Sequence, residues 1–220
     1  MKARLLFICL LSALFTCHVR GQALKPFIRG GVTNSWFDSS GATEESMWQA
    51  GPYIGVGIKL PLNKWRSLFI EPTLAAISKG DVYKADKAGG RVSFSIWYLE
   101  TQLDFIYRIK IGKHWRIPFG TGLYGAYGIG SKVSATNGIT WFRGIPVSTS
   151  ISMFDDIIGA NRWDAGWRVS TVGVEYRRFM FRWNFEVGFF PQFSSRMPHG
   201  YNQECYGENC TMSWNIGYSF

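Results

Sequence analysis

The stretch TMSWNIGYSF, residues 211 to 220, alternates strictly between large apolar residues and small or polar residues. One side of this period of two carries Met212, Trp214, Ile216, Tyr218 and Phe220, and the other side carries Thr, Ser, Asn, Gly and Ser. Successive side chains of a β-strand point to opposite faces of a sheet, so this pattern predicts a strand with one apolar face and one polar face.

The same period recurs along the whole chain after residue 21, and no later stretch shows a convincing helical period. In YLETQLDFIYRI, residues 98 to 109, leucines and aromatic residues alternate with Glu100, Gln102, Asp104 and Arg108. We therefore predict an all-β protein, an eight-stranded antiparallel up-and-down barrel. Its expected strands cover residues 26–37, 50–61, 67–78, 93–111, 116–130, 164–177, 179–192 and 211–220.

Alternation does not say which face points inward. A soluble secreted barrel of the lipocalin kind buries its apolar face, whereas a transmembrane barrel turns that face toward lipid. The connections between the expected strands alternate between long and short, with short turns at 62–67, 112–116 and 177–178. Short periplasmic turns and long extracellular loops are typical of outer-membrane barrels, so this asymmetry favours the membrane interpretation.

Aromatic residues are placed as two belts along the expected strands. Rings at the two headgroup levels of a bilayer are typical of membrane barrels. The set near the short turns is Trp65, Tyr107, Trp115 and Tyr176, and the set near the long loops is Trp36, Trp97, Tyr98, Trp163 and Trp167.

The first residues predict export. Lys2 and Arg4 precede a thirteen-residue, mainly apolar run from Leu5 to Cys17, and small residues follow before Gln22. We predict a cleaved signal peptide at 1–21 and a barrel domain at 22–220, located in the outer membrane of a Gram-negative bacterium. An anchoring helix is the alternative, but the run is shorter than the ~20 residues that span a bilayer. Lipidation at Cys17 is a second alternative.

Charge and cysteine content restrict the partners. Removal of the signal, which holds three basic residues and no acidic one, lowers the formal net charge from +9 to +6. The remaining basic residues are scattered, many at expected turns, which favours contact with anionic lipid headgroups over nucleic acid. In an oxidising compartment, Cys205 and Cys210 of ECYGENC are expected to form a local disulfide. The histidines do not cluster, so no metal and no cofactor is expected.

The end of the chain and its strands resemble a known family. Trp214, Ile216, Tyr218 and Phe220 resemble the terminal signature of outer-membrane barrels, which the barrel-assembly machinery recognises during biogenesis. Together with FIRGGVTNSWF, YIGVGIKLPLNKWRSLFIEPTLAAISKG and YLETQLDFIYRIKIG, the chain from 24 to 220 resembles the PorT-like outer-membrane β-barrel family of Bacteroidetes-type bacteria. Members include a component of the type IX protein-secretion system. The resemblance implies the fold more strongly than a function, and it supplies no catalytic motif.

Charged residues on the expected inner face predict an ionic plug, because an eight-stranded barrel is only wide enough for side chains to fill. Buried charges are tolerated when they are paired. A proton relay or ligand site is the alternative function for this set. Its members are Glu71, Glu100, Asp104, Arg108, Arg182 and Glu186.

The long loop at 131–163 is rich in apolar residues, which must be covered by something. Its lid or partner candidates are Trp141, Phe142, Met153 and Phe154. We predict a non-enzymatic structural or accessory subunit, in contact with membrane lipid and with a protein partner through its long loops. A lipid-modifying enzyme that uses His199 is one alternative, and a soluble secreted ligand-binding barrel is another.

Overall fold

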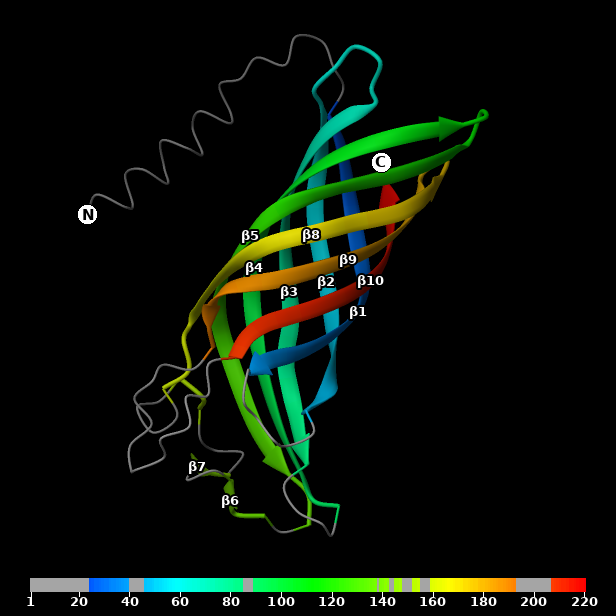
Figure 1. The fold of residues 1–220 in the computed structure, drawn as a ribbon. Helices are drawn as coiled ribbons and strands as arrows, with labels where there is room; N and C mark the ends of the chain where they lie inside the picture. Colours follow the sequence, from blue (N-terminus) through cyan, green and yellow to red (C-terminus); the bar gives the residue numbers. More distant parts are fainter. Residues whose placement is uncertain are drawn as a thin grey trace, which may run out of the picture.

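The computed structural model describes residues 24–39, 46–84, 89–137, 139–142, 145–147, 152–154, 159–192 and 207–220. Eight antiparallel strands form a closed barrel in the order β1-β10-β9-β8-β5-β4-β3-β2 (Figure 1). Their bounds are β1 Lys25–Ser39, β2 Ser46–Pro61, β3 Leu68–Lys84, β4 Arg91–Ile111, β5 Trp115–Ala135, β8 Trp163–Tyr176, β9 Phe179–Pro191 and β10 Gly207–Ser219. Each barrel strand pairs with the next barrel strand along the chain, and β10 closes the ring on β1, so the predicted up-and-down barrel is confirmed.

The last strand closes the sheet against the first along most of its length. Thirteen residues of β10 pair with β1, from Phe27 opposite Ser219 to Ser39 opposite Gly207. The backbone amide of Phe220 adds a 3.0 Å hydrogen bond to the carbonyl of Pro26. Closure leaves no open sheet edge at the level of these strands, which a bilayer would not tolerate.

The apolar face of the strands points outward. Leu123, Phe181 and Ile216 are 52%, 43% and 68% exposed, whereas Lys79, Arg168 and Arg182 are completely buried. A barrel in water would have the reverse arrangement, so the orientation is that of a protein embedded in lipid. Among the described residues, no helix has the length and apolar character needed to cross a bilayer.

The short turns lie together at the end that carries both ends of the barrel sequence, at the top of Figure 1. The turn after β2 is held by Asn63, whose side-chain oxygen accepts hydrogen bonds from the amides of Ser67 at 2.9 Å and Leu68 at 3.2 Å. Arg66 in this turn and Arg177 in the turn after β8 adopt positive φ angles of 53° and 54°. We call this end the periplasmic end, and the opposite end the outer end.

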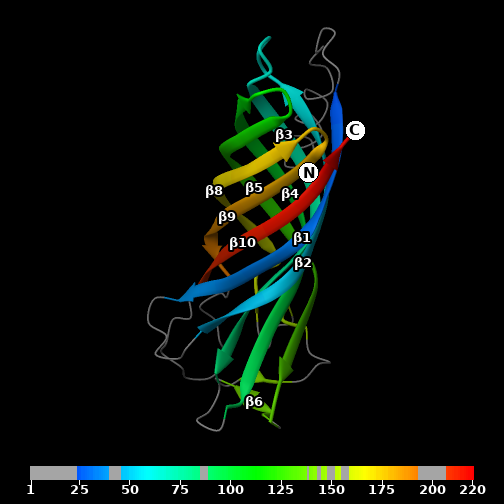
Figure 2. The same ribbon diagram turned by 90° about the vertical axis from the view of Figure 1, so that its right-hand side faces the viewer.

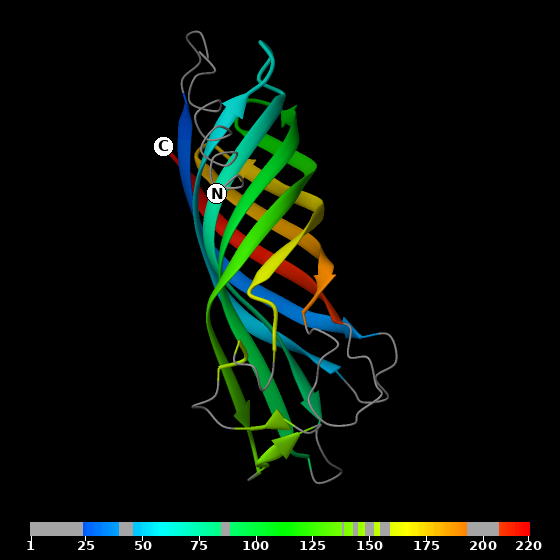
Figure 3. The same ribbon diagram turned by 90° about the vertical axis from the view of Figure 1, so that its left-hand side faces the viewer.

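Several strands continue further outward than their sequence pattern predicts, and three neighbours, β3, β4 and β5, extend beyond the rest (Figure 3). β3 ends at Lys84 instead of residue 78, and β5 ends at Ala135 instead of residue 130. Pairing is continuous to the tip, with Lys84 opposite Arg91 and Val92 opposite Ala135. Figure 3 shows β3, β4 and β5 running past the neighbouring strands. We call residues 78–84, 91–97 and 129–135 the outer extension.

The polarity of β4 inverts where the outer extension begins. Its inward side chains are Glu100, Gln102 and Asp104 within the barrel, but Val92, Phe94 and Ile96 beyond Tyr98. Water rather than hydrocarbon surrounds this part of the strand, so the apolar face turns to the inside. Tyr98 was predicted in the outer aromatic belt, and this is wrong. Its ring is completely buried, and its hydroxyl donates to Gln192 Oε1 at 2.8 Å.

Candidate functional site: the ionic interior

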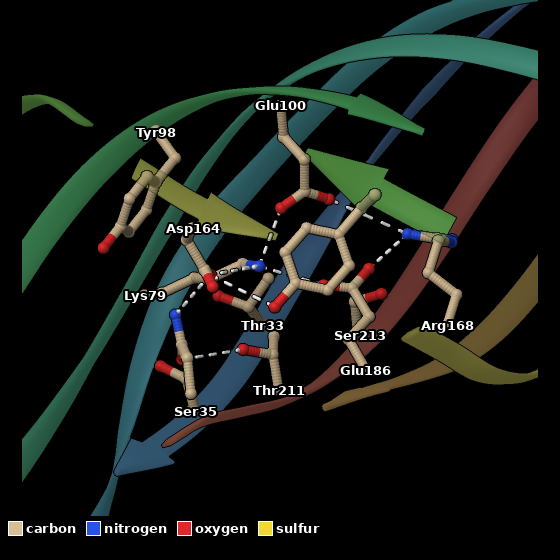
Figure 4. Close-up of polar contacts among 12 residues, drawn as sticks. Thr33, Ser35, Lys79, Tyr98, Glu100, Asp164, Arg168, Glu186, Thr211 and Ser213 are labelled. Atoms are coloured by element: carbon tan, nitrogen blue, oxygen red, sulfur yellow. Dashed lines mark hydrogen bonds and ion pairs between the residues drawn. The ribbon is translucent and has the colours of Figure 1, made fainter. Parts of the chain in front are cut away.

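The outer half of the barrel interior is organised around the ammonium group of Lys79. Its Nζ lies 2.7 Å from Glu100 Oε2, 3.1 Å from Glu186 Oε2 and 3.7 Å from Asp164 Oδ2. The same group stands 4.0 Å from the centre of the Tyr124 ring. Figure 4 shows these side chains converging from β3, β4, β8 and β9. One cation therefore joins three carboxylates from strands far apart in sequence.

Arg168 extends this cluster toward the middle of the barrel. Its Nε donates to Asp104 Oδ1 at 2.7 Å, and its Nη1 contacts Glu186 and lies 3.8 Å from Glu100 Oε1. A planar guanidinium can serve several carboxylate oxygens at once, which suits a position between β4 and β9.

A second cluster centred on Glu175 fills the periplasmic half. Its carboxylate oxygens lie 2.7 Å from Arg182 Nη2, 2.8 Å from Lys59 Nζ and 3.1 Å from Arg108 Nε. Arg182 Nη2 also lies 3.4 Å from Glu71 Oε1. Three cations here face two carboxylates, whereas in the outer cluster carboxylates outnumber cations.

Together with Arg29, the two clusters balance in charge. Near the junction Arg29 donates through Nη2 to Thr73 Oγ1 at 2.8 Å, and its guanidinium lies 4.7 Å from the Phe27 ring centre. Mutual neutralisation is what makes so many buried charges tolerable. The buried cations of the clusters are Arg29, Lys59, Lys79, Arg108, Arg168 and Arg182, and their carboxylates are Glu71, Glu100, Asp104, Asp164, Glu175 and Glu186.

Apolar side chains cover the ionic layer on both sides. At the periplasmic end Phe27, Phe69, Ile106 and Met180 are buried, and the Arg108 guanidinium lies 3.9 Å from the Phe69 ring centre. At the outer end a larger apolar cluster includes Ile77, Phe94, Ile96, Tyr98, Ala126 and Met153. The interior is thus a paired ionic layer between two apolar layers.

The structure places all six interior residues that the sequence suggested inside the barrel, and it brings each into an ion pair. Sequence reasoning missed Arg29, Lys59, Lys79, Asp164, Arg168 and Glu175. Residues an even number apart on a strand point to the same face. Lys79 lies eight residues after Glu71 on β3, so this rule could have identified it. The same rule fails on β8, because a bulge between Arg168 and Ser170 moves the inward-pointing side chains from even to odd residue numbers.

Part of the long loop lies over the outer mouth. Met153 is completely buried in the apolar cluster, its amide donates to Ser131 Oγ at 2.9 Å, and its carbonyl accepts from the Ala160 amide. Phe154 packs on Gly128, and Arg162 lies 4.6 Å from its ring centre. Trp141 and Phe142 form β6 (Trp141–Phe142), which pairs with β7 (Ile145–Pro146), and their side chains lie outside the described residues.

The remaining predicted site residues divide between the outer wall and the undescribed segments. Trp214, Ile216, Tyr218 and Phe220 line the lipid-facing side of the last strand. Cys205, His199 and the predicted signal peptide at 1–21 lie outside the described residues, so the disulfide with the buried Cys210 and the enzyme alternative stay predictions. Within the described part of the chain, no group of His, Cys, Asp and Glu has the arrangement of a metal site.

The chain shows distant similarity to several solved outer-membrane protein structures. Solved structures with a similar fold include surface protein A of Neisseria at 12% identity (TM-score 0.48), OprG of Pseudomonas aeruginosa at 13% (0.47) and Ail of Yersinia pestis at 11% (0.42). Each comparison covers 90% of this chain and 100%, 97% and 100% of the other chain, respectively. No curated protein matched the sequence.

The family is shown by a sequence model rather than by these distant structures. The model described as outer membrane protein beta-barrel domain matches residues 25–194, which include seven of the eight barrel strands. The expected location in the outer membrane is therefore confirmed, and the alternative of a soluble secreted barrel is wrong. The chain belongs to the outer-membrane protein β-barrel domain family.

Proposed function

We propose that this protein is a non-conducting, non-enzymatic barrel that acts as a structural or accessory subunit in the outer membrane and presents its outer extension to a protein partner. The observation that carries the proposal is the filled interior, in which paired charges lie between two apolar layers. A barrel with a filled interior offers no path for solutes, so we place its function on the surfaces that it exposes outside the membrane.

The ionic layer supports the non-conducting part. A conducting pore needs a water-filled path with sites that ions can enter and leave. Here Lys79 and Arg168 bind carboxylates from opposite parts of the wall, and Phe27 and Phe69 lie on their periplasmic side. Opening a path would separate buried ion pairs, which is costly.

The outer extension supports the display part. Beyond a bulge at Ile129 its three strands stay paired to their tips, and Phe94, Ile96 and Val133 form a buried apolar core within it. A sheet with its own core holds its shape beyond the membrane and keeps its exposed residues at fixed positions. Lys84, Arg91 and Lys132 are exposed on it. Such a surface suits a partner that must dock at a defined height above the bilayer.

The resemblance to the PorT-like family adds a kind of complex to the proposal: a secretion or outer-membrane assembly complex. During biogenesis the last strand is proposed to engage the barrel-assembly machinery through Trp214, Ile216, Tyr218 and Phe220. Membrane lipid surrounds the outward apolar face, as for any transmembrane barrel.

Conductance tests the first part of the proposal. The purified protein in a planar bilayer should give no discrete current steps between −100 and +100 mV, a range of about the size of a membrane potential. A well-characterised porin inserted in the same bilayer is the positive control. Reproducible unitary currents from the wild-type protein would contradict a filled interior.

Site-specific crosslinking in cells tests the second part. A photoreactive residue at position 132, on the outer extension, should crosslink to a discrete protein. The same residue at position 113, in the turn after β4 at the periplasmic end, is the matched control, because both positions hold exposed lysines. No product at position 132, or the same product at both positions, would contradict display by the outer extension.

A further inference from the structure

The periplasmic end of the barrel is strongly basic. Eight cations lie in its short turns and at the adjoining strand ends: Lys25, Lys64, Arg66, Lys110, Lys113, Arg116, Arg177 and Arg178. Among the described residues of these turns and strand ends, the single carboxylate side chain is that of Glu175, and it is buried against Lys59. Among the described residues, this end of the barrel therefore carries a strong excess of positive charge.

An apolar groove lies on the lipid-facing surface of the barrel near the periplasmic end, where the last strand closes against the first. It has a volume of about 340 Å³ and is lined by residues of β1, β2, β9 and β10: Ile28, Arg29, Gly30, Ile54, Phe179, Ile216, Gly217 and Tyr218. Figure 2 shows these four strands crossing the face of the barrel together. Ile28, Ile54 and Ile216 expose their side chains to the surroundings, so the groove is open to lipid.

The groove exists because Gly30 stands on the lipid-facing side of β1. Gly30 lies opposite Ile54 on one neighbouring strand and Ile216 on the other. An added Cβ would meet nothing closer than the carbonyl oxygen of Tyr53, at 3.9 Å. A Cβ would therefore fit here without a clash, and the missing side chain leaves a channel between the flanking isoleucines.

A cation is fixed at the periplasmic rim of this groove. The Arg178 guanidinium donates through Nη1 to the Tyr218 hydroxyl at 3.1 Å. The Tyr218 ring in turn packs edge-on against Phe179, with ring centres 5.4 Å apart. The Tyr218 ring thus lines the groove, and its hydroxyl lies at the level of the lipid headgroups. Through this hydroxyl it holds the fully exposed Arg178 beside the groove.

We propose that the groove is a binding site for an anionic phospholipid of the periplasmic leaflet, with an acyl chain over Gly30 and the phosphate group beside Arg178. The apolar walls match a hydrocarbon chain, and the guanidinium matches a phosphate group in charge and geometry. Arg178 would repel the ammonium group of a zwitterionic headgroup at this position, so the site favours a headgroup with net negative charge. The site lies at the opposite end from the outer extension and does not depend on the proposed partner.

Native mass spectrometry from mild detergent tests the site directly. The protein is mixed with equal amounts of phosphatidylglycerol and phosphatidylethanolamine that carry identical acyl chains, so that the headgroup is the variable. We expect one retained lipid per barrel and a preference for phosphatidylglycerol of about fivefold, which corresponds to about 1 kcal/mol for one basic residue at a membrane surface. Equal retention of the two lipids would overturn the proposal.

Variants separate the two halves of the site. Arg178→Gln should remove the headgroup preference, and Tyr218→Phe should reduce it by releasing the arginine. Gly30→Leu should lower retention of both lipids about fivefold, because its side chain occupies the groove.

Lys113→Gln removes a rim charge away from the groove and should leave the preference unchanged. The same loss in Lys113→Gln as in Arg178→Gln would overturn a defined site, as would full retention in Gly30→Leu. A heat-dependent shift in gel migration verifies that each barrel is closed.

Discussion

Lys79 Nζ and Glu100 Oε2 lie 2.7 Å apart in the outer half of the barrel interior, and both side chains are completely shielded from solvent. The two residues come from adjacent strands, and their pair is completed by Glu186 and Asp164 from the far side of the wall. An ion pair in this position contributes to stability mainly through the penalty for leaving either partner alone.

Replacement of the central lysine should therefore be severe. Lys79→Met leaves Glu100, Asp164 and Glu186 without their common cation, and we expect the free energy of unfolding to fall by about 3–5 kcal/mol. Urea titration in lipid vesicles, followed by tryptophan fluorescence, measures the change. Lys113→Met, in an exposed turn, is the matched control and should stay within about 0.5 kcal/mol of wild type. A loss below 1 kcal/mol for Lys79→Met would mean that the ionic layer is solvated.

The inversion of polarity along the strands predicts a position-dependent cost of charge on the outer wall. Leu123→Arg places a cation on the lipid-facing side of β5 and should destabilise the protein by about 2–4 kcal/mol. Ser134→Arg, further along the same strand in the outer extension, should change stability by less than about 0.5 kcal/mol. Equal effects in the same urea titration would place both residues in one environment and contradict the assigned membrane boundary.

The segment over the outer mouth should open when its anchor is removed. Met153→Ala leaves a cavity in the apolar cluster, and the local cost is about 2–5 kcal/mol. The amide of Ala160, which donates to the Met153 carbonyl at 2.9 Å, should then exchange with solvent faster, by a factor of 10 or more. Hydrogen exchange with mass spectrometry measures this change, and amides of β10 serve as the internal reference. Unchanged exchange at Ala160 would show that Met153 does not hold the segment in place.

The terminal aromatic residue should matter for assembly more than for stability. Phe220→Ala is expected to reduce the amount of folded protein in cells at least threefold, because the proposed recognition by the barrel-assembly machinery uses this residue. Phe179→Ala is the matched control, since Phe179 and Phe220 are 61% and 66% exposed on the same wall. Gel-shift analysis of membranes, with refolding of both variants in vitro, separates the two effects. Equal loss for both variants in cells would contradict a specific signature.

Much of the architecture was predictable because period-two alternation extends through nearly all of the strands. The eight strands, their antiparallel order and their outward apolar faces follow from patterns such as that of Leu99 to Ile109, supported by the unequal lengths of the connections. The outer ends of the strands were less predictable. Beyond Tyr98 the alternation continues but its meaning reverses, because the surroundings change from hydrocarbon to water.

The partners within the barrel could not be predicted from the strands one at a time. Alternation places Glu71, Glu100 and Glu186 on the polar side of their strands, but it carries no information about which cations lie opposite them. Closure, strand tilt and the bulge at Arg168 bring Lys79 to Glu186 and Lys59 to Glu175, pairs separated by more than one hundred residues. The sequence by itself determined that each strand has one apolar and one polar side, since that is a local property of alternating side chains, and the short and long connections favoured the apolar side as the one that meets lipid. Only the tertiary structure decided which charges neutralise each other, because those neighbours meet across the barrel axis and not along the chain.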